Sequence, residues 1–190
     1  MIRSFIAIEL ENKETIENII SFTQRIKQNQ PKVKLVEPKN LHMTLKFLGN
    51  IPESLAPKIY TILHEEINER MFQGKNFKYQ LKGVGQFNRF SVLWIKLVGN
   101  IQFLQKIKDS IEDFLFGKLK IQRDKRSQFK PHLTIGRLKK ERINYKNFDV
   151  FKNLINENKT TDFGEFNINQ IKFKKSELTP KGPIYTDLIF

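Results

Sequence analysis

The sequence predicts an α+β fold of two similar, pseudo-symmetric lobes, each with one antiparallel sheet flanked by helices. Segments with the two-residue alternation of strands are interspersed with segments whose apolar residues have helical spacing. Two short segments share the pattern histidine, any residue, threonine, apolar residue, and they lie 90 positions apart in a chain of 190. No low-complexity linker separates the halves. We therefore expect residues 1–190 to form a single domain made of the two lobes.

The first part of the chain predicts strand, helix, strand and helix in that order. Residues 2–9 are rich in β-forming residues and predict a strand. Isoleucines at helical spacing predict a helix over residues 13–29, which Pro31 ends. Residues 41–48 alternate as a strand, and residues 53–72 have the apolar spacing of a second amphipathic helix. In the strand, one face is expected to carry the apolar residues Leu41, Met43, Leu45 and Phe47, and the other His42, Thr44 and Lys46.

The remainder of the chain follows a similar plan. Apolar spacing predicts a helix from Ile101 to about Gly117 and a weaker helix over residues 147–158. The expected strands cover residues 77–87, 91–98, 131–138, 163–173 and 184–190. Gly83 and Gly85, inside the first of these strands, fit bulge or turn positions better than a phosphate-binding loop, because no G-x-G-x-x-G motif follows.

The composition indicates a globular, strongly basic protein. The net charge is +14, the sequence pI is about 9.9, and 39% of the residues are hydrophobic. The positive electrostatic field of such a protein attracts polyanions such as nucleic acid or an anionic membrane. Cysteine is absent, which excludes disulfides and thiolate metal sites. Without a signal-peptide pattern or a membrane-spanning apolar run, we expect a cytoplasmic protein that does not associate with membranes.

The repeated pattern is the main indication of chemistry. Side chains at positions i and i+2 share one face of a strand, so His42 lies beside Thr44, and His132 beside Thr134. If the lobes pair about a pseudo-twofold axis, these four side chains meet in one cleft. Histidine exchanges protons near neutral pH, so one imidazole could accept a proton while the other donates one. That pairing suits an in-line displacement at phosphorus.

The neighbouring hydroxyl and guanidinium groups suit a phosphate. The hydroxyls of Thr44 and Thr134 can donate hydrogen bonds to non-bridging phosphate oxygens, where charge builds in the transition state. Arg137 could add a bidentate contact to the same phosphate. No metal or other cofactor is expected, because two strand histidines without nearby carboxylates or thiolates make a poor zinc site.

Other residues have simpler interpretations. A lone His-x-Thr is common on strands, and only the matched pair indicates function. His64 has no partner motif and is expected at the surface, as is the charged run 139–142, although that run could guide RNA. Most phenylalanines are expected in the core, while Phe87 and Phe90 are candidates to stack on a base.

Four segments resemble one known family: Arg3–Glu9, Val36–Gly49, Phe129–Arg137 and Gly182–Tyr185. They are similar to the RNA 2′,3′-cyclic phosphodiesterases, also called 2′–5′ RNA ligases, of the two-histidine phosphoesterase superfamily. The similarity runs in order along nearly the whole chain, and both His-x-Thr segments match the family pattern. The helices contribute little to it.

The resemblance implies a bilobal fold with the active-site cleft between the lobes. It also implies metal-independent hydrolysis of a terminal RNA 2′,3′-cyclic phosphate to a 2′-phosphomonoester, with a possible 2′–5′ ligation activity. By the family pattern, His42 would be the proton donor, His132 the proton acceptor, and Thr44 and Thr134 phosphate-binding residues. Arg137 matches as a further phosphate contact. The expected partner is RNA with a 2′,3′-cyclic phosphate end, and the expected state is a monomer.

Two alternatives remain open on the sequence alone. The first is a non-catalytic RNA-binding protein that uses the basic cleft, which would bind RNA whatever its terminal group. The second is a phosphodiesterase that acts on a small cyclic nucleotide or sugar phosphate.

Overall fold

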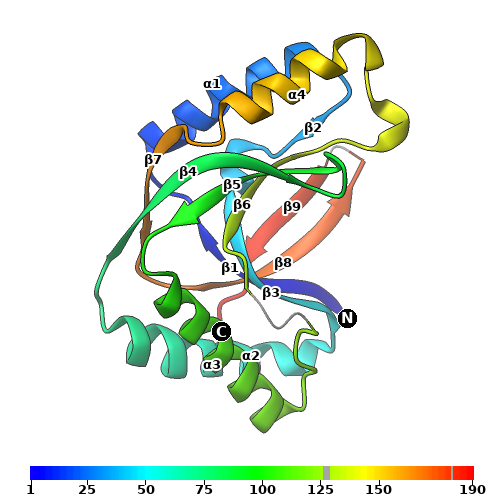
Figure 1. Cartoon of the computed structure of the whole chain (residues 1–190). Coiled ribbons are helices and arrows are strands. Elements are labelled where there is room, and N and C mark those ends of the chain that lie inside the picture. Colours follow the sequence, from blue (N-terminus) through cyan, green and yellow to red (C-terminus); the bar gives the residue numbers. More distant parts are fainter. Residues whose placement is uncertain (126–128, 181) are drawn as a thin grey trace.

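The computed structural model describes residues 1–125, 129–180 and 182–190. In these residues the strands form two antiparallel sheets (Figure 1). The first sheet has the strand order β3-β1-β8-β9, and the second has the order β2-β6-β5-β4-β7. The strands of the first sheet are β1 (Ile2–Glu9), β3 (His42–Ile51), β8 (Lys172–Thr179) and β9 (Gly182–Asp187). Those of the second are β2 (Lys34–Leu35), β4 (Phe77–Phe87), β5 (Val92–Val98), β6 (His132–Arg137) and β7 (Asp162–Ile168).

Helices flank both sheets. Figure 1 shows α1 (Lys13–Asn29) and α4 (Phe148–Glu157) together on the side of the second sheet, and α2 (Ala56–Ile62) and α3 (Ile101–Leu119) on the side of the first. The Thr15 hydroxyl of α1 donates a hydrogen bond of 2.8 Å to the carbonyl of Glu165 in β7. The remaining helical segments are η1 (Pro38–Asn40), η2 (Glu53–Leu55), the π-helix η3 (Leu63–Phe72), η4 (Lys140–Arg142) and η5 (Tyr145–Asn147). The predicted fold class, α+β with two antiparallel sheets flanked by helices, is confirmed.

The two sheets are not consecutive halves of the chain. The first sheet takes β1 and β3 from the N-terminal part and β8 and β9 from the C-terminal end. The single strand predicted over residues 163–173 is therefore wrong: β7 and β8 belong to different sheets, and the chain crosses between them. Asn68 holds this crossing, because its side chain accepts a hydrogen bond from the Ile171 amide (2.8 Å) and donates one to the Ile171 carbonyl (3.0 Å).

A β-bulge in β3 changes which of its side chains face inward. Ala7 pairs with Thr44 and Ile6 pairs with Lys46, so Leu45 is an extra residue in β3. The expected alternation over residues 41–48 holds through Leu45 and then breaks: Lys46 is 3% exposed and Phe47 is 62% exposed. The prediction that Lys46 shares a face with His42 while Phe47 points to the core is wrong, because the bulge shifts the alternation by one residue.

Several predicted boundaries also move. The residues predicted as one helix over 53–72 form three successive segments, η2, α2 and η3. α3 continues past Gly117 to Leu119, and Lys120 ends it in the left-handed conformation with φ of 57°. The last strand covers residues 182–187 rather than 184–190, and the two-residue strand β2 has no clear sequence signal.

Gly83 occupies a bulge, as predicted. The β4–β5 register shifts between Leu81 and Val84, and Gly83 has φ of 87°. A Cβ atom at this position would lie 2.3 Å from the carbonyl oxygen of Lys159, so neither the conformation nor the space suits another residue.

One apolar core joins both sheets to the helices. It includes Ile6 and Met43 from the first sheet, Leu93 and Leu133 from the second, and Ile26 of α1. Met43 and Leu133 are the middle residues of the two His-x-Thr segments, and both are fully buried. Burial of these two residues turns the histidine and threonine on either side of each toward the opposite face of its strand.

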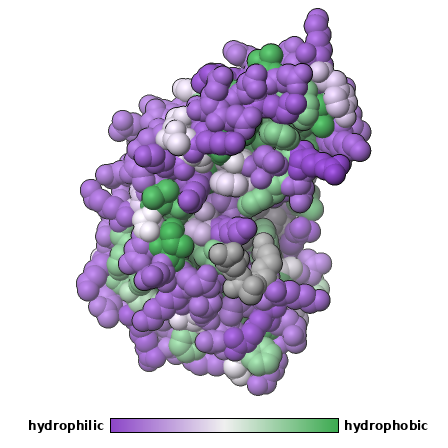
Figure 2. Space-filling model, viewed as in Figure 1, coloured by the Kyte–Doolittle hydropathy of each residue, from purple (hydrophilic) through white to green (hydrophobic). Residues whose placement is uncertain are grey.

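One face of the molecule is largely polar (Figure 2). Figure 2 shows a predominantly hydrophilic face with small apolar patches. No helix in the described part of the chain combines the length and hydropathy that a membrane-spanning segment requires.

Candidate active site

A large cavity of about 1390 Å³ lies between the two sheets. The first sheet contributes His42 and Thr44 to its lining, and the second contributes His132, Thr134 and Arg137. The structure thus brings all five residues singled out from the sequence to one cavity. β3 lies against β6, so the two histidine-bearing strands face one another across it.

The two histidines have the same backbone support. Nδ1 of His42 lies 2.6 Å from the carbonyl oxygen of Asn40, and Nδ1 of His132 lies 2.6 Å from that of Lys130. A carbonyl oxygen only accepts hydrogen bonds, so Nδ1 carries a hydrogen in both rings. Nε2 is then the nitrogen of each imidazole that can take up or release a proton.

Asn40 is itself fixed. Its side chain is buried, and its amide Nδ2 donates a hydrogen bond of 3.3 Å to the carbonyl of Pro183 at the start of β9. The carbonyl that orients His42 is therefore held against a strand from the far end of the chain.

Aromatic rings support each imidazole in a matching way. The Tyr185 ring stands edge-on to His42, with centroids 5.3 Å apart, and Phe5 lies 5.1 Å from the same imidazole. The Phe87 ring stands edge-on to His132 at 5.1 Å, and Trp94 lies 6.1 Å away. The interplanar angle is 88° for both edge-on pairs. Such contacts restrict rotation of the imidazole rings.

These supporting rings were largely missed from the sequence. Trp94 carries no motif, and Tyr185 appears only as the end of a segment shared with the family. Of the two phenylalanines expected as base contacts, Phe87 lines the cavity, whereas Phe90 packs against Phe148 and Phe151.

Gly85 gives Trp94 its place beside His132. The two residues are directly opposite each other in the β4–β5 pair, and a Cβ atom on Gly85 would lie 2.2 Å from the indole ring. The absence of a side chain therefore lets the indole lie flat over β4. The prediction of a bulge or turn at Gly85 is therefore wrong, because Gly85 pairs regularly with Trp94 and serves to leave room for its ring.

The charge of Arg137 acts across the cavity. Arg137 is the last residue of β6 in the second sheet, yet its charge lowers the pKa of both His42 and Tyr185 in the first. Burial outweighs this effect for Tyr185 and raises the pKa of its hydroxyl. Arg137 lines the cavity together with His42 and Tyr185, so an anion bound there would meet its positive charge.

His42 has a lowered pKa in the free protein. Burial is the main cause, because it disfavours the charged imidazolium, and the charges of Lys174 and Arg137 add to it. The hydrogen bond to Asn40 and the charge of Glu9 oppose the shift without cancelling it. His42 is therefore neutral in the free protein at neutral pH.

The lowered pKa of His42 can be measured by NMR titration of the imidazole protons, with the His42 signal assigned from a His42→Gln variant. We expect a midpoint below the ordinary value of 6.5 in the free protein. Inorganic phosphate should raise the midpoint, because an anion favours the imidazolium. A midpoint at or above 6.5 without phosphate would contradict this description of the site.

Most of the charged residues that line the cavity, among those the structure describes, are basic. Glu37 is the acidic one, and the six basic residues are Lys27, Lys34, Lys108, Lys125, Lys130 and Arg137. A cavity with a positive potential concentrates anionic ligands. Within residues 1–125, 129–180 and 182–190, no three His, Asp or Glu side chains gather as a metal site would require.

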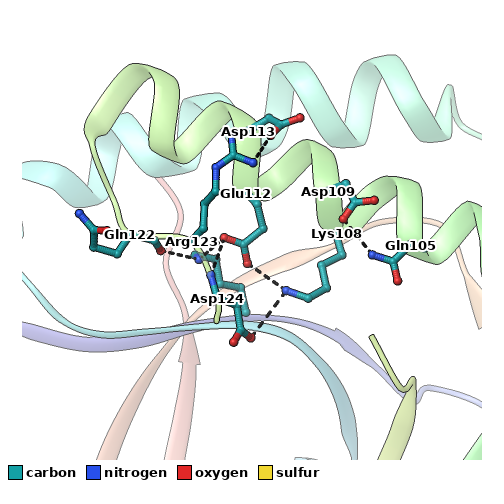
Figure 3. Close-up of polar contacts among 9 residues, drawn as sticks. Gln105, Lys108, Asp109, Glu112, Asp113, Gln122, Arg123 and Asp124 are labelled. Carbon is teal, nitrogen blue, oxygen red and sulfur yellow. Dashed lines mark hydrogen bonds and ion pairs between the residues drawn. The ribbon is translucent and has the colours of Figure 1, made fainter. Parts of the chain in front are cut away.

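A buried ionic network lies next to this cavity (Figure 3). The Glu112 carboxylate of α3 accepts hydrogen bonds from the ammonium group of Lys46, which the bulge turns inward, and from that of Lys108 (2.9 Å). It also accepts a bond of 3.2 Å from the backbone amide of Asp124, and Lys46 donates one of 2.9 Å to the carbonyl of Gln122. The network therefore ties β3 and α3 to the segment that follows α3.

Two other sequence candidates lie outside the cavity lining. His64 is 49% exposed and lies 3.8 Å from Glu69, consistent with the surface position expected for it. The charged run 139–142 is likewise not among the described residues that line the cavity.

Comparisons with known proteins agree with this geometry. The model of the family described as the AKAP7 2′5′ RNA ligase-like domain matches residues 4–186. A protein of Archaeoglobus fulgidus named RNA 2′,3′-cyclic phosphodiesterase is 36% identical over 98% of this chain and 97% of its own length. A protein of the same name from Methanocaldococcus jannaschii is 35% identical over 96% of each chain.

Solved structures share the fold. A crystal structure of a Thermus thermophilus protein superposes with a TM-score of 0.68 at 26% identity and covers 98% of this chain and 95% of that one. Escherichia coli LigT in its apo form has a TM-score of 0.68 at 23% identity, covers 99% and 95% of the two chains, and shows the likeness of fold alone. Together with the family match over residues 4–186, these similarities show that the chain belongs to the 2′–5′ RNA ligase-like family, as the four segments indicated.

Proposed function

We propose that this protein hydrolyses the 2′,3′-cyclic phosphodiester at an RNA end to a 2′-phosphomonoester, with two histidines as acid and base. The observation that carries the proposal is the convergence of both His-x-Thr segments, from different sheets, on one basic cavity. The names of the relatives, RNA 2′,3′-cyclic phosphodiesterase at 35–36% identity over nearly the whole chain, support the same substrate class.

In the proposed reaction, water attacks phosphorus in line with the 3′ oxygen. His132 accepts the proton of the attacking water, a new P–O bond forms, and the P–O3′ bond breaks. His42 donates a proton from Nε2 to the departing 3′ oxygen, so the phosphate stays on the 2′ oxygen. The Nδ1 bonds to Asn40 and Lys130 keep both rings in the tautomer that this exchange requires.

Thr44, Thr134 and Arg137 are proposed to hold the phosphate. The two hydroxyls would donate to the non-bridging oxygens, and the guanidinium would add a charged contact. All three line the cavity beside the histidines. Their contribution grows as negative charge builds on those oxygens in the transition state.

The lowered pKa of His42 makes protonation depend on the substrate. A proton donor must carry its proton when the reaction starts, but the free protein favours neutral His42. A bound cyclic phosphate brings a negative charge that favours the imidazolium and offsets the charge of Arg137. We propose that His42 takes up its proton as the RNA end binds.

The same arrangement accommodates ligation. With an RNA 5′-hydroxyl in place of water, the same displacement would join two ends by a 2′–5′ bond.

One chain supplies both histidines and both threonines of the cavity. We therefore propose that residues 1–190 act as one catalytic unit and that the protein is a monomer.

The experiment compares three ligands at several salt concentrations: RNA with a 2′,3′-cyclic phosphate end, the same RNA with a 3′-hydroxyl end, and a mononucleoside 2′,3′-cyclic phosphate. We expect turnover of the cyclic-phosphate RNA with the highest kcat/KM. Equal, salt-sensitive binding of both RNAs without turnover would instead indicate a non-catalytic RNA-binding protein. A higher kcat/KM for the mononucleotide would indicate a small-molecule phosphodiesterase.

A further inference from the structure

Phe47 is an exposed aromatic residue in the wall of the cavity. It lines the cavity together with His42 and Thr44, and 62% of its surface is exposed. The bulge at Leu45 produces this position, because regular alternation would turn Phe47 toward the core. The proposed acid–base reaction has no part for it.

The surroundings of Phe47 connect it to the reacting end of the cavity. Its ring centroid lies 6.4 Å from that of Phe5, directly opposite on β1, and Phe5 in turn lies 5.1 Å from His42. Phe5 is 4% exposed and packs beneath both rings, so Phe47 and His42 are parts of one continuous wall. A ligand whose phosphate is beside His42 therefore has its next groups within reach of Phe47.

Charge identifies the kind of ligand. Lys34, Lys125 and Lys130 are exposed and line the same cavity, so a ligand that fills it meets cations as well as the aromatic face of Phe47. Proteins that bind single-stranded nucleic acid combine these two features, with cations along the backbone and aromatic rings under the bases. A simple apolar ligand would not need the cations, and a bare phosphate would not need the ring.

We propose that Phe47 is a stacking platform for a nucleobase of the RNA whose cyclic phosphate end lies between the two histidines. This inference rests on the proposed function and extends it to a base contact. Part of the affinity for RNA then comes from stacking of a base on the Phe47 ring, a contact that a base-free sugar phosphate cannot make.

The test compares Phe47→Ala with the wild type on two substrates. One is a short RNA with a 2′,3′-cyclic phosphate end, and the other is a ribose 2′,3′-cyclic phosphate with a methoxy group in place of the base. We expect Phe47→Ala to raise KM for the RNA roughly 5- to 150-fold, the range of one lost base-stacking contact. KM for the base-free compound and kcat for both should stay within about twofold of the wild type.

Further variants separate stacking from general apolar contact and from folding. Phe47→Trp should keep the affinity for RNA, whereas Phe47→Leu should lose most of it. Tyr145→Ala is the matched control, because Tyr145 is 67% exposed in η5 and is not among the cavity-lining residues. Thermal melting should be nearly the same for all variants, since these side chains are mostly exposed.

Binding of an RNA that already carries a terminal 2′-phosphate gives a readout without turnover. Its Kd should rise in Phe47→Ala by the same factor as KM. Unchanged KM and Kd for RNA, or an equal loss with the base-free compound, would overturn the stacking role. Absence of turnover in the wild type together with the expected change in Kd would contradict the proposed function and leave the base contact supported.

Discussion

Replacing either His42 or His132 by alanine is expected to lower kcat on cyclic-phosphate RNA by about 10²- to 10⁴-fold, the usual contribution of a positioned acid or base. Both imidazoles line the cavity and belong to different sheets, so neither can substitute for the other. Because each faces the cavity rather than the core, the variants should remain folded. The measurement is steady-state hydrolysis at saturating substrate, with circular dichroism and thermal melting to check folding.

His64→Ala is the control for these variants. It removes the third histidine of the chain, which is half-exposed and outside the cavity lining, so kcat should not change. Wild-type kcat in either His42→Ala or His132→Ala would contradict the two-histidine mechanism. A large loss in His64→Ala would show that turnover reports a general effect of histidine removal.

Glu112→Ala is expected to reduce the free energy of unfolding by about 3–5 kcal/mol, as is typical when one partner of a buried ion pair is removed. The Glu112 carboxylate accepts from Lys46 and Lys108, whose side chains are 3% and 7% exposed. Without it, two ammonium groups remain buried close to each other. Urea unfolding followed by circular dichroism measures the loss.

The matched control is Asp113→Ala, one residue further along α3. Asp113 pairs with Arg123 at 2.5 Å, but both side chains are more than half exposed (62% and 53%; Figure 3). This change should cost less than about 1 kcal/mol. Equal losses from the two variants would contradict the buried network as a source of stability.

The effect of Glu112 should depend on pH. Burial alone would raise its pKa, but the bonds from Lys46 and Lys108 hold the pKa below its ordinary value of 4.5. The stabilisation is therefore complete above pH 4.5 and is lost as the pH falls through the folded-state pKa. The difference between wild type and Glu112→Ala should narrow in the same range.

Much of the fold could be predicted from local patterns. Strand alternation and helical spacing located nearly all the longer elements, because each buries one face against the core. The pairing of strands could not be found in this way. Residues 163–173 read as one strand, since only the Asn68 bonds to Ile171, which join distant parts of the chain, reveal where β7 ends and β8 begins.

The two histidines of the site could be predicted from the repeated motif, but the aromatic residues that support them could not. His42 and His132 stand out as rare residues in matched frames on short alternating strands. The pairing of strands brings three further rings against the histidines: Tyr185, Phe87 and Trp94. No repeated motif in the sequence indicates these contacts.

The bulge at Leu45 was also invisible to the alternation pattern. It depends on the register between β1 and β3, and it turns Lys46 toward Glu112 while it turns Phe47 into the cavity. A pattern of apolar and polar residues does not encode a one-residue register shift.

The product formed from an RNA with a 2′,3′-cyclic phosphate end tests the proposed chemistry most directly. Protonation of the 3′ oxygen by His42, with water activated by His132, predicts a 2′-phosphomonoester and a free 3′-hydroxyl. ³¹P NMR together with digestion by a phosphatase specific for 3′-phosphates distinguishes the two possible products. A 2′-phosphate supports the assignment of donor and acceptor, whereas a 3′-phosphate or an unchanged cyclic end would contradict it.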